Sequence, residues 1–112
     1  MINIHGIPAF SDNYIWCLVD DKGNAIIIDP GCAEPVEQFL NDNNLTLEAI
    51  LVTHHHHDHI GGVKQLKEKY SPIIFGFKEA NFDFLYVKVS EGQSFEILNL
   101  QFKTIKVPGN TL

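Results

Sequence analysis

Basic side chains, cysteines and long apolar runs are all scarce in this chain of 112 residues. Eight lysines and no arginine stand against 14 acidic side chains, which gives a formal net charge of -6 at pH 7. A chain without a basic patch cannot release the counterions that drive binding to phosphate backbones, and this excludes a nucleic-acid partner. No apolar run approaches the roughly 20 residues that a helix needs to cross a bilayer, so we expect no membrane partner.

The two cysteines, Cys17 and Cys32, stand in unrelated sequence contexts. We predict free thiols in a reducing compartment, with a disulfide between them as the alternative. The opening stretch MINIHGIPAF has neither the basic region nor the long apolar region of a signal peptide. These observations together predict a cytoplasmic location.

Apolar side chains alternate between strand-like and helix-like spacing along the chain, and the length suits one domain. Strands are predicted around His5 and at residues 14–20, 25–29, 48–53 and 72–77, helices at residues 33–44 and 61–70, and three further short strands in the last third, with turns at Glu91-Gly92 and Asn99. Strands that alternate with helices predict an α/β fold, here a mixed sheet with helices on one face.

A histidine-rich segment, THHHHDHIGG, follows directly on the buried strand at residues 48–53 and precedes a helix. Alternate residues of an extended chain point the same way, so His54 and His56 can bind one metal ion. The turn after them brings Asp58 and His59 towards a second ion. Imidazole and carboxylate donors without a nearby thiolate suit Zn²⁺, Fe²⁺ or Mn²⁺. The pair Gly61-Gly62 lets the backbone turn tightly into the helix.

Two other interpretations compete with a metal site. An affinity tag is normally an uninterrupted run at a chain terminus, whereas this run is internal and contains an aspartate. A solvated polar loop would explain the polarity but not the alternating spacing behind a buried strand. The pattern therefore favours metal binding, at the carboxyl end of a central strand, where open α/β sheets place their sites.

The segment THHHHDHIGG resembles the metal-binding motif of the metallo-β-lactamase superfamily. Three further stretches, IPAFSDNYIW, IIIDPG and VPGNTL, are similar to the glyoxalase II (hydroxyacylglutathione hydrolase) branch, and the resemblance runs from Ile7 to Leu112. The family fold is an αβ/βα sandwich of two halves followed by a helical domain that holds glutathione. The resemblance implies that residues 1–112 form one incomplete domain, the N-terminal half of that sandwich.

The resemblance also implies a role for each candidate residue. His54 and His56 would bind the first ion, and Asp58 and His59 the second, with Asp58 also holding the nucleophilic water. Asp29 of the IIIDPG stretch would orient a ligand histidine. The implied reaction is hydrolysis of the thioester S-lactoylglutathione to lactate and glutathione, a step of methylglyoxal detoxification. The implied cofactors are two ions of zinc, iron or manganese.

The chain departs from the family pattern in two ways. Asn110 stands where the family's PGHTL pattern has a ligand histidine, and a neutral amide is a poor substitute for imidazole on zinc. The family's bridging aspartate, its last ligand histidine and its substrate domain would all lie beyond Leu112. Since a catalytic zinc normally has three protein ligands, we expect weak binding of one ion or none, and negligible thioesterase activity.

Two strands, at residues 25–29 and 48–53, are apolar on both faces, so half a sandwich would leave one sheet face bare. A bare apolar face predicts a homodimer or a swapped assembly that covers it. Phe10, Tyr14 and Trp16 are predicted in the core, Cys32 is a filler of apolar space, and the lysines of VKQLKEK form a solvated helix face.

Three functional interpretations follow. The first is an enzyme by descent, a glyoxalase II-type hydrolase represented by its N-terminal part. The second is a non-catalytic half-domain that binds metal weakly or acts as an assembly module, which Asn110 favours. The third, a lactamase or another hydrolase of the superfamily, fits the IPAFSDNYIW stretch less well.

Overall fold

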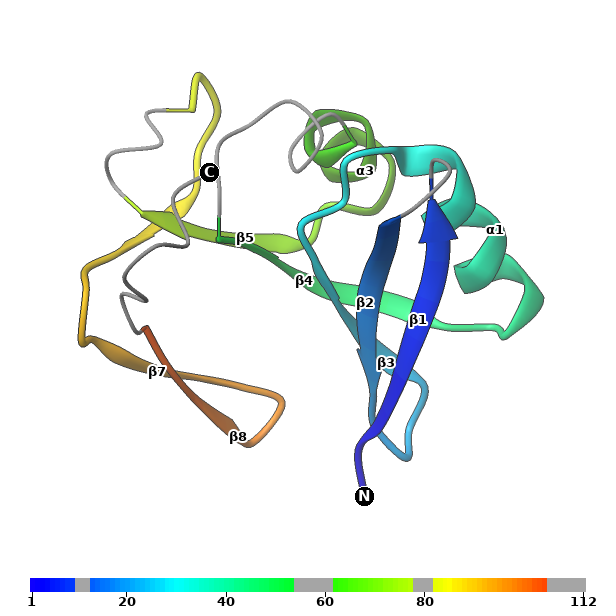
Figure 1. Cartoon of the computed structure of the whole chain (residues 1–112), viewed down its shortest axis with the longest axis horizontal. Helices are drawn as coiled ribbons and strands as arrows, with labels where there is room; N and C mark the ends of the chain where they lie inside the picture. Colours follow the sequence, from blue (N-terminus) through cyan, green and yellow to red (C-terminus); the bar gives the residue numbers. More distant parts are fainter. Residues whose placement is uncertain (10–12, 54–61, 78–81, 105–112) are drawn as a thin grey trace.

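A computed structural model of the whole chain describes residues 1–9, 13–53, 62–77 and 82–104 (Figure 1). The elements in chain order are β1 (Asn3–Ala9), β2 (Asn13–Val19), β3 (Asn24–Ile28), α1 (Ala33–Asp42), β4 (Thr46–Val52), α3 (Val63–Tyr70), β5 (Ile73–Phe77), β6 (Val87–Val89), β7 (Ser94–Ile97) and β8 (Leu100–Lys103). Every strand and helix predicted from the sequence pattern is present, within a few residues of its predicted bounds.

The main sheet has six strands in the order β1-β2-β3-β4-β5-β6, and β7 and β8 form a separate antiparallel hairpin. β1, β2 and β3 pair antiparallel, whereas β3 to β6 pair parallel, so the sheet is mixed as predicted. In the chain, α1 lies between the parallel strands β3 and β4, and α3 lies between β4 and β5. The carboxyl ends of β3, β4 and β5 therefore meet at one edge of the sheet.

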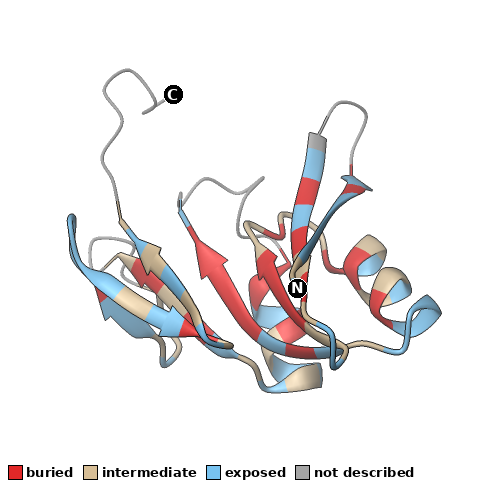
Figure 2. Cartoon of the chain, turned by 90° about the horizontal axis from the view of Figure 1, so that it is seen from below, coloured by how far each residue is buried: buried red, intermediate tan, exposed pale blue. Residues whose placement is uncertain are grey.

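Both helices pack on one face of the sheet, which confirms the predicted arrangement. Their apolar side chains, Val36 and Leu40 of α1 and Leu66 of α3, are fully buried against Ile27 and Ile50 of the central strands. Figure 2 shows buried residues gathered on the central strands and on the sides of the helices that face them. Each such aliphatic side chain stabilises the fold by about 1.5–3 kcal/mol on burial.

A polar contact holds the two helices together at the surface. The Glu37 carboxylate of α1 accepts a hydrogen bond of 2.9 Å from the Gln65 side-chain amide of α3 and forms an ion pair with Lys69. Lys64 and Lys69 are exposed, as expected for a solvated helix face, whereas Lys67 is half-buried.

The opposite face of the sheet is partly covered by the β7–β8 hairpin, and the prediction of a wholly bare face is wrong there. Ile97 of β7 packs with Ile26, Ala49 and Leu51 in a second apolar cluster. The Phe95 ring stacks on a sheet residue, Phe75, with ring centroids 4.9 Å apart. The last third of the chain turns back over β3, β4 and β5, a long-range contact that local spacing does not reveal.

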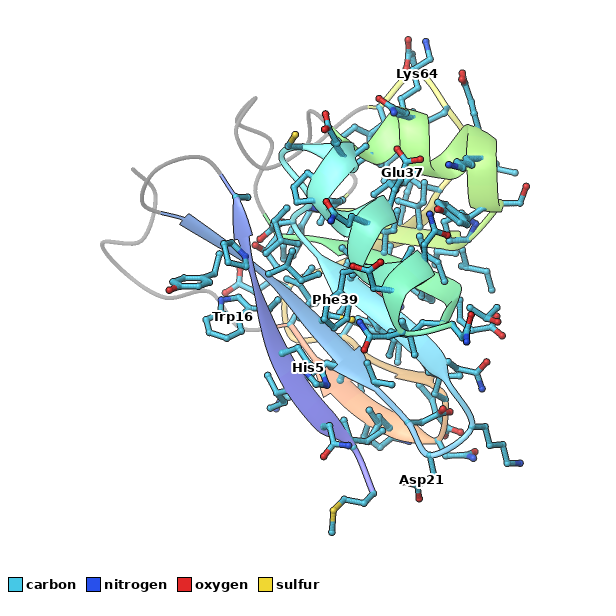
Figure 3. All side chains as sticks on the ribbon, turned by 90° about the vertical axis from the view of Figure 1, so that its right-hand side faces the viewer. His5, Trp16, Asp21, Glu37, Phe39 and Lys64 are labelled. Carbon is cyan, nitrogen blue, oxygen red and sulfur yellow. The ribbon has the colours of Figure 1, made fainter. Side chains whose placement is uncertain are left out.

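Large apolar side chains remain exposed on β1 and β2, and also at Ile73 of β5 and Val87 of β6. Ile4, Tyr14 and Trp16 are 67%, 60% and 48% exposed, so the prediction that Tyr14 and Trp16 belong to the core is wrong. Trp16 shares a strand face with Leu18, which faces the hairpin cluster, but the hairpin does not cover the β1–β2 end of the sheet. Figure 3 shows Trp16 pointing away from α1. The prediction for Phe10 lies outside the described residues.

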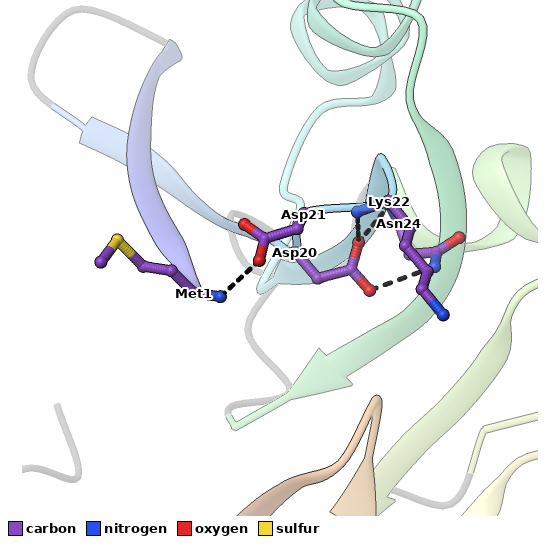
Figure 4. Close-up of polar contacts among 5 residues, drawn as sticks. All are labelled: Met1, Asp20, Asp21, Lys22 and Asn24. Carbon is purple, nitrogen blue, oxygen red and sulfur yellow. Dashed lines mark hydrogen bonds and ion pairs between the residues drawn. The ribbon is translucent and has the colours of Figure 1, made fainter.

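The turn between β2 and β3 forms where the sequence predicts it (Figure 4). The Asp20 carboxylate accepts hydrogen bonds of 2.9 Å from the backbone amides of Asn24 and Lys22 and one of 3.1 Å from the Asn24 side chain. The backbone hydrogen bond from Asn24 is the main reason that the pKa of Asp20 lies below its usual value. Asp21 forms an ion pair of 2.7 Å with the amino group of Met1, across the strand ends.

Among the residues that the structure describes, neither helix has the length and apolar character needed to cross a membrane.

Candidate metal centre

The candidate site is built at the carboxyl ends of two neighbouring parallel strands. Asp29 directly follows β3 and Thr53 directly follows β4, and these strands are in register with Ile28 opposite Leu51. The Asp29 amide donates a hydrogen bond of 2.9 Å to the Leu51 carbonyl, which extends the strand pairing by one residue. The pairing thus brings a carboxylate beside the residue that precedes His54.

Both carboxylate oxygens of Asp29 accept hydrogen bonds from Thr53. The Thr53 backbone amide donates to Oδ1 at 2.7 Å, and the Thr53 hydroxyl donates to Oδ2. Hydrogen bonds to an ionised carboxylate are stronger than those between neutral groups. Asp29 makes them from the left-handed region, with φ of 50°, which aspartate tolerates better than most residues. Asp29 therefore fixes the position of Thr53, whereas its role in orienting a ligand histidine stays a prediction.

The other end of the histidine segment meets the same turn. Gly62, the residue before α3, donates a backbone hydrogen bond of 2.8 Å to the carbonyl of Pro30. A Cβ at position 62 would lie 2.6 Å from the Ala33 nitrogen, 2.7 Å from the Cys32 carbonyl carbon and 2.8 Å from the Pro30 oxygen. Backbone atoms thus leave no room for a side chain at position 62, so glycine is needed there for this close approach and not for a tight turn, since its φ of -96° and ψ of -7° are open to other residues.

The predicted ligands His54, His56, Asp58 and His59, and the altered position Asn110, lie outside the described residues, as does Gly61. Residues 1–9, 13–53, 62–77 and 82–104 contain no group of three or more histidine, cysteine or acidic side chains that could hold a metal ion. The assignment of ligands therefore stays a prediction from the sequence.

The remaining histidine and the two thiols are described. His5 lies beside Phe39 of α1, with ring centroids 5.3 Å apart (Figure 3). Cys17 and Cys32 are free, as predicted. Burial raises the pKa of the Cys17 thiol to about 12, so it stays protonated at neutral pH. Cys32 is half-buried and directly precedes α1, next to Gly62.

Two residues of this site were missed by reasoning from the sequence alone. The hydroxyl of Thr53 was not considered as a metal ligand. Only its position between a buried strand and the first histidine could have indicated a role at the site. The carbonyl of Pro30 carries no sequence signal, because any residue could supply it. The donors predicted between these anchored ends, imidazole and carboxylate, are those that zinc, iron and manganese accept, and a carboxylate beside such ligands is the usual partner for orienting them.

The chain belongs to the metallo-beta-lactamase superfamily, since the model of that family matches residues 14–109. It is also 46% identical over 112 residues to the hydroxyacylglutathione hydrolase of Cronobacter sakazakii (strain ATCC BAA-894). That match covers 99% of this chain and 45% of the relative, so the chain spans less than half the relative's length. The resemblance inferred from the motifs is confirmed, including its restriction to an N-terminal portion.

Two solved structures share the fold. The B3 metallo-beta-lactamase BLEG-1 superposes with a TM-score of 0.78 at 24% identity, over 99% of this chain and 63% of that chain. ETHE1 from Myxococcus xanthus superposes with a TM-score of 0.71 at 26% identity, over 92% of this chain and 46% of that chain. These likenesses confirm the predicted α/β fold class.

Proposed function

We propose that this chain carries the metal-binding half of a thioester hydrolase site of the hydroxyacylglutathione hydrolase type. The observation that carries the proposal is the pair of hydrogen bonds between Asp29 and Thr53, at the carboxyl ends of parallel strands and directly before His54. The curated relative's name supports hydroxyacylglutathione as the substrate class, and S-lactoylglutathione is the member that the motifs imply.

In this proposal His54 and His56 hold one ion, and Asp58 and His59 hold the other, with zinc as the first choice and iron or manganese as alternatives. Such ions, when bound, would supply Lewis-acid polarisation and a water molecule of lowered pKa. Asp29 fixes the start of the ligand segment through Thr53 and carries no reacting atom. Residues 1–112 act as a single incomplete domain.

The ligand set within these 112 residues is short of what each ion requires. Asn110 offers a neutral oxygen where the family pattern has imidazole, and each ion would keep two strong ligands. We therefore propose weak binding of one ion or none by the chain alone, with negligible thioesterase activity. The supporting argument is ligand count, and steady turnover of S-lactoylglutathione by the purified 112-residue chain would contradict it.

A non-catalytic role is the alternative, and the exposed side chains of β1 and β2 favour it. Ile4, Tyr14 and Trp16 lie on one face of the sheet beside the area that the hairpin covers. β1 is also an edge strand of the sheet and contains no lysine, arginine, aspartate or glutamate, so only Pro8, which lacks an amide hydrogen, opposes pairing with another strand. We propose that a homodimer or a swapped assembly covers this surface. The free thiols support a reducing, cytoplasmic location.

Metal content per chain tests the proposed site. Freshly purified protein would be compared by elemental analysis with a double variant, His54→Ala and His56→Ala, and with His5→Ala as the matched control. His5 lies in β1, outside the motif, so its loss should leave the metal content unchanged. Metal that is present in the wild type and in His5→Ala but lost from the double variant would support the proposal.

Equal, non-zero metal content in all three proteins would count against this site, whereas no metal in any of them would show that the ligands of this chain alone are too few to hold an ion. In the second case the function of the chain would be sought in its assembly. Sedimentation of the same samples separates the two interpretations, because the dimer proposal requires mass to rise with concentration while the metal proposal does not.

A further inference from the structure

β1 presents an open edge, and its backbone groups alternate between the sheet and that edge. The Asp20 amide donates a hydrogen bond of 3.0 Å to the Asn24 carbonyl, which continues the pairing of β2 with β3. Even-numbered residues of β2 therefore direct their backbone groups to β3, and odd-numbered residues direct theirs to β1. Odd-numbered residues of β1 lie opposite odd-numbered residues of β2. The N–H and C=O groups of Ile4 and Gly6 consequently face away from the sheet.

Three further observations agree with an accessible edge. Pro8 occupies another outward position, and proline, which lacks an N–H, is found at such positions of edge strands. Gly6 is exposed even though the Trp16 ring lies 3.1 Å from where its Cβ would stand. His5 is exposed even though it lies beside Phe39 of α1. The helix therefore leaves this part of the edge open to another strand.

The distribution of charge favours a second copy of the chain as the occupant of this edge. The chain has 14 acidic side chains and a net charge of -6, so two copies repel each other wherever acidic side chains meet. The strand Asn3–Ala9 carries no acidic or basic side chain, and the amino group of Met1 at its end is already paired with Asp21. A basic partner would find no acidic side chain on this strand, whereas a second copy would meet no like charge.

The outward groups select one antiparallel register. With His5 opposite its own counterpart, Ile4 lies opposite Gly6 of the second copy, and every outward N–H and C=O of these two residues finds a partner. Centring the two-fold axis on Gly6 would place Ile4 opposite Pro8, which has no N–H for the Ile4 carbonyl. Centring it on Ile4 would place Gly6 opposite Ile2, which precedes the strand. The axis at His5 is therefore the best of the three.

The same register covers exposed apolar side chains. The Trp16 ring lies over Gly6 of its own chain, and Ile4 of the second copy would stand opposite that glycine. Ile4 would thus pack beside the ring, once in each half of the dimer. Ile4 and Trp16 are 67% and 48% exposed in the single chain, so both have surface to bury. Tyr14 stacks on Trp16 with ring centroids 5.9 Å apart and extends the same surface.

From these contacts we infer that two copies of the chain pair antiparallel through Ile4 and Gly6 of β1, about a two-fold axis at His5. The inference rests on the assembly proposed above as the alternative function, and in it neither copy exchanges an element with the other. An aromatic side chain buries about 150–250 Å² when fully covered, so the partly exposed Ile4, Tyr14 and Trp16 offer on the order of 300 Å² per copy. Stable interfaces bury roughly 800 Å² per partner, so this dimer is weak and depends on concentration.

Charges placed at His5 test the register, because only a residue on the axis lies opposite itself. In His5→Asp and in His5→Lys like charges would meet, and each variant alone should dimerise at least about tenfold more weakly than the wild type in sedimentation over a concentration series. An equimolar mixture of the two should recover the dimer, because unlike charges then meet. Asn3→Asp and Asn3→Lys are the matched controls. Asn3 is exposed on the same strand and would lie opposite Ile7, so mixing these two should bring no gain.

Amide hydrogen exchange of the wild type tests the same pairing without a substitution. The amides of Ile4 and Gly6 face the open edge in the single chain and should exchange more slowly as the protein concentration rises. The amides of His5 and Ile7 face β2 and should change less.

The outcomes separate this pairing from the wider assembly proposal. A dimer that each charged variant loses and the mixture recovers would support the inference. A dimer that persists in every variant, without slower exchange at Ile4 and Gly6, would overturn the inference but not an assembly through another surface. Loss in both variants without recovery in the mixture would overturn the axis at His5. A wild-type chain that stays monomeric at all concentrations would overturn both the inference and the assembly proposal.

Discussion

Replacing Gly62 with alanine sets two physical effects against each other. Its φ of -96° and ψ of -7° lie in a region that alanine adopts without strain. On backbone entropy alone, such a replacement stabilises a protein by about 0.4–1 kcal/mol, because the unfolded chain loses freedom. The new Cβ, however, would meet three backbone atoms at 2.6, 2.7 and 2.8 Å, and none of them can move as a side-chain tip can.

The steric effect should dominate. Forcing a methyl group into a packed site costs about 1–3 kcal/mol, and contacts with backbone alone favour the upper part of that range. Even after the entropy gain is subtracted, we expect a net loss of about 2 kcal/mol of unfolding free energy. For a domain of this size, that loss lowers the melting temperature by roughly 8–16 °C.

Thermal and urea unfolding of Gly62→Ala and the wild type measure this loss. Gly92→Ala is a useful comparison, since Gly92 has φ of 79° but nothing within 4 Å of a new Cβ. That variant isolates the cost of a positive φ, about 1 kcal/mol. A Gly62→Ala protein as stable as the wild type, or more so, would refute the close contact between the start of α3 and the Asp29–Pro30 turn.

Three further predictions concern other parts of the chain. A thiol reagent at pH 8 should label the native protein only at Cys32, because burial raises the pKa of Cys17 to about 12, and Cys32→Ser should abolish labelling until the protein is unfolded; labelling of native Cys17 would contradict its burial. The hydrogen bonds to Asp20 lower its pKa, so the stability that they contribute is present above the usual value of about 3.9 and is lost as pH falls through the folded-state pKa. The urea midpoint of Asp20→Asn should therefore trail the wild type at pH 6, and the gap should narrow as pH falls below the usual value and through the lowered folded-state pKa, whereas a pH-independent gap would be inconsistent with this linkage. Trp16→Ser should reduce self-association in sedimentation without loss of secondary structure, since Trp16 is already 48% exposed; a wild-type chain that stays monomeric at all concentrations would argue against the proposed interface.

The elements of the fold follow from local patterns, which is why the sequence predicts them well. Val36, Phe39 and Leu40 recur at helical spacing, and α1 forms there with Val36 and Leu40 fully buried. The errors concern contacts between distant segments. Whether Tyr14 and Trp16 are buried depends on how far the β7–β8 hairpin extends across the sheet, and no spacing within β2 encodes that distance.

At the candidate site, too, some residues could be predicted from the sequence, whereas the contacts between distant segments could not. Asp29 is predicted through the resemblance of the IIIDPG stretch to the family, which implies its role beside the ligands. Its partner Thr53 lies 24 positions away, and the link between them exists only because β3 and β4 pair in parallel. The crowding at Gly62 comes from backbone atoms of Pro30, Cys32 and Ala33. The residues next to Gly62 in the sequence therefore give no indication of it.

The parallel centre of the sheet has a consequence for how the molecule tolerates change. β3, α1, β4, α3 and β5 follow one another along the chain, and Asp29, Thr53 and Gly62 belong to this stretch. The antiparallel strands β1 and β2 lie on one side of it, and the β7–β8 hairpin packs across its far face. Substitutions in these outer parts should therefore change solubility or association while the hydrogen bonds between Asp29 and Thr53 stay intact, so selection can act on the two regions separately.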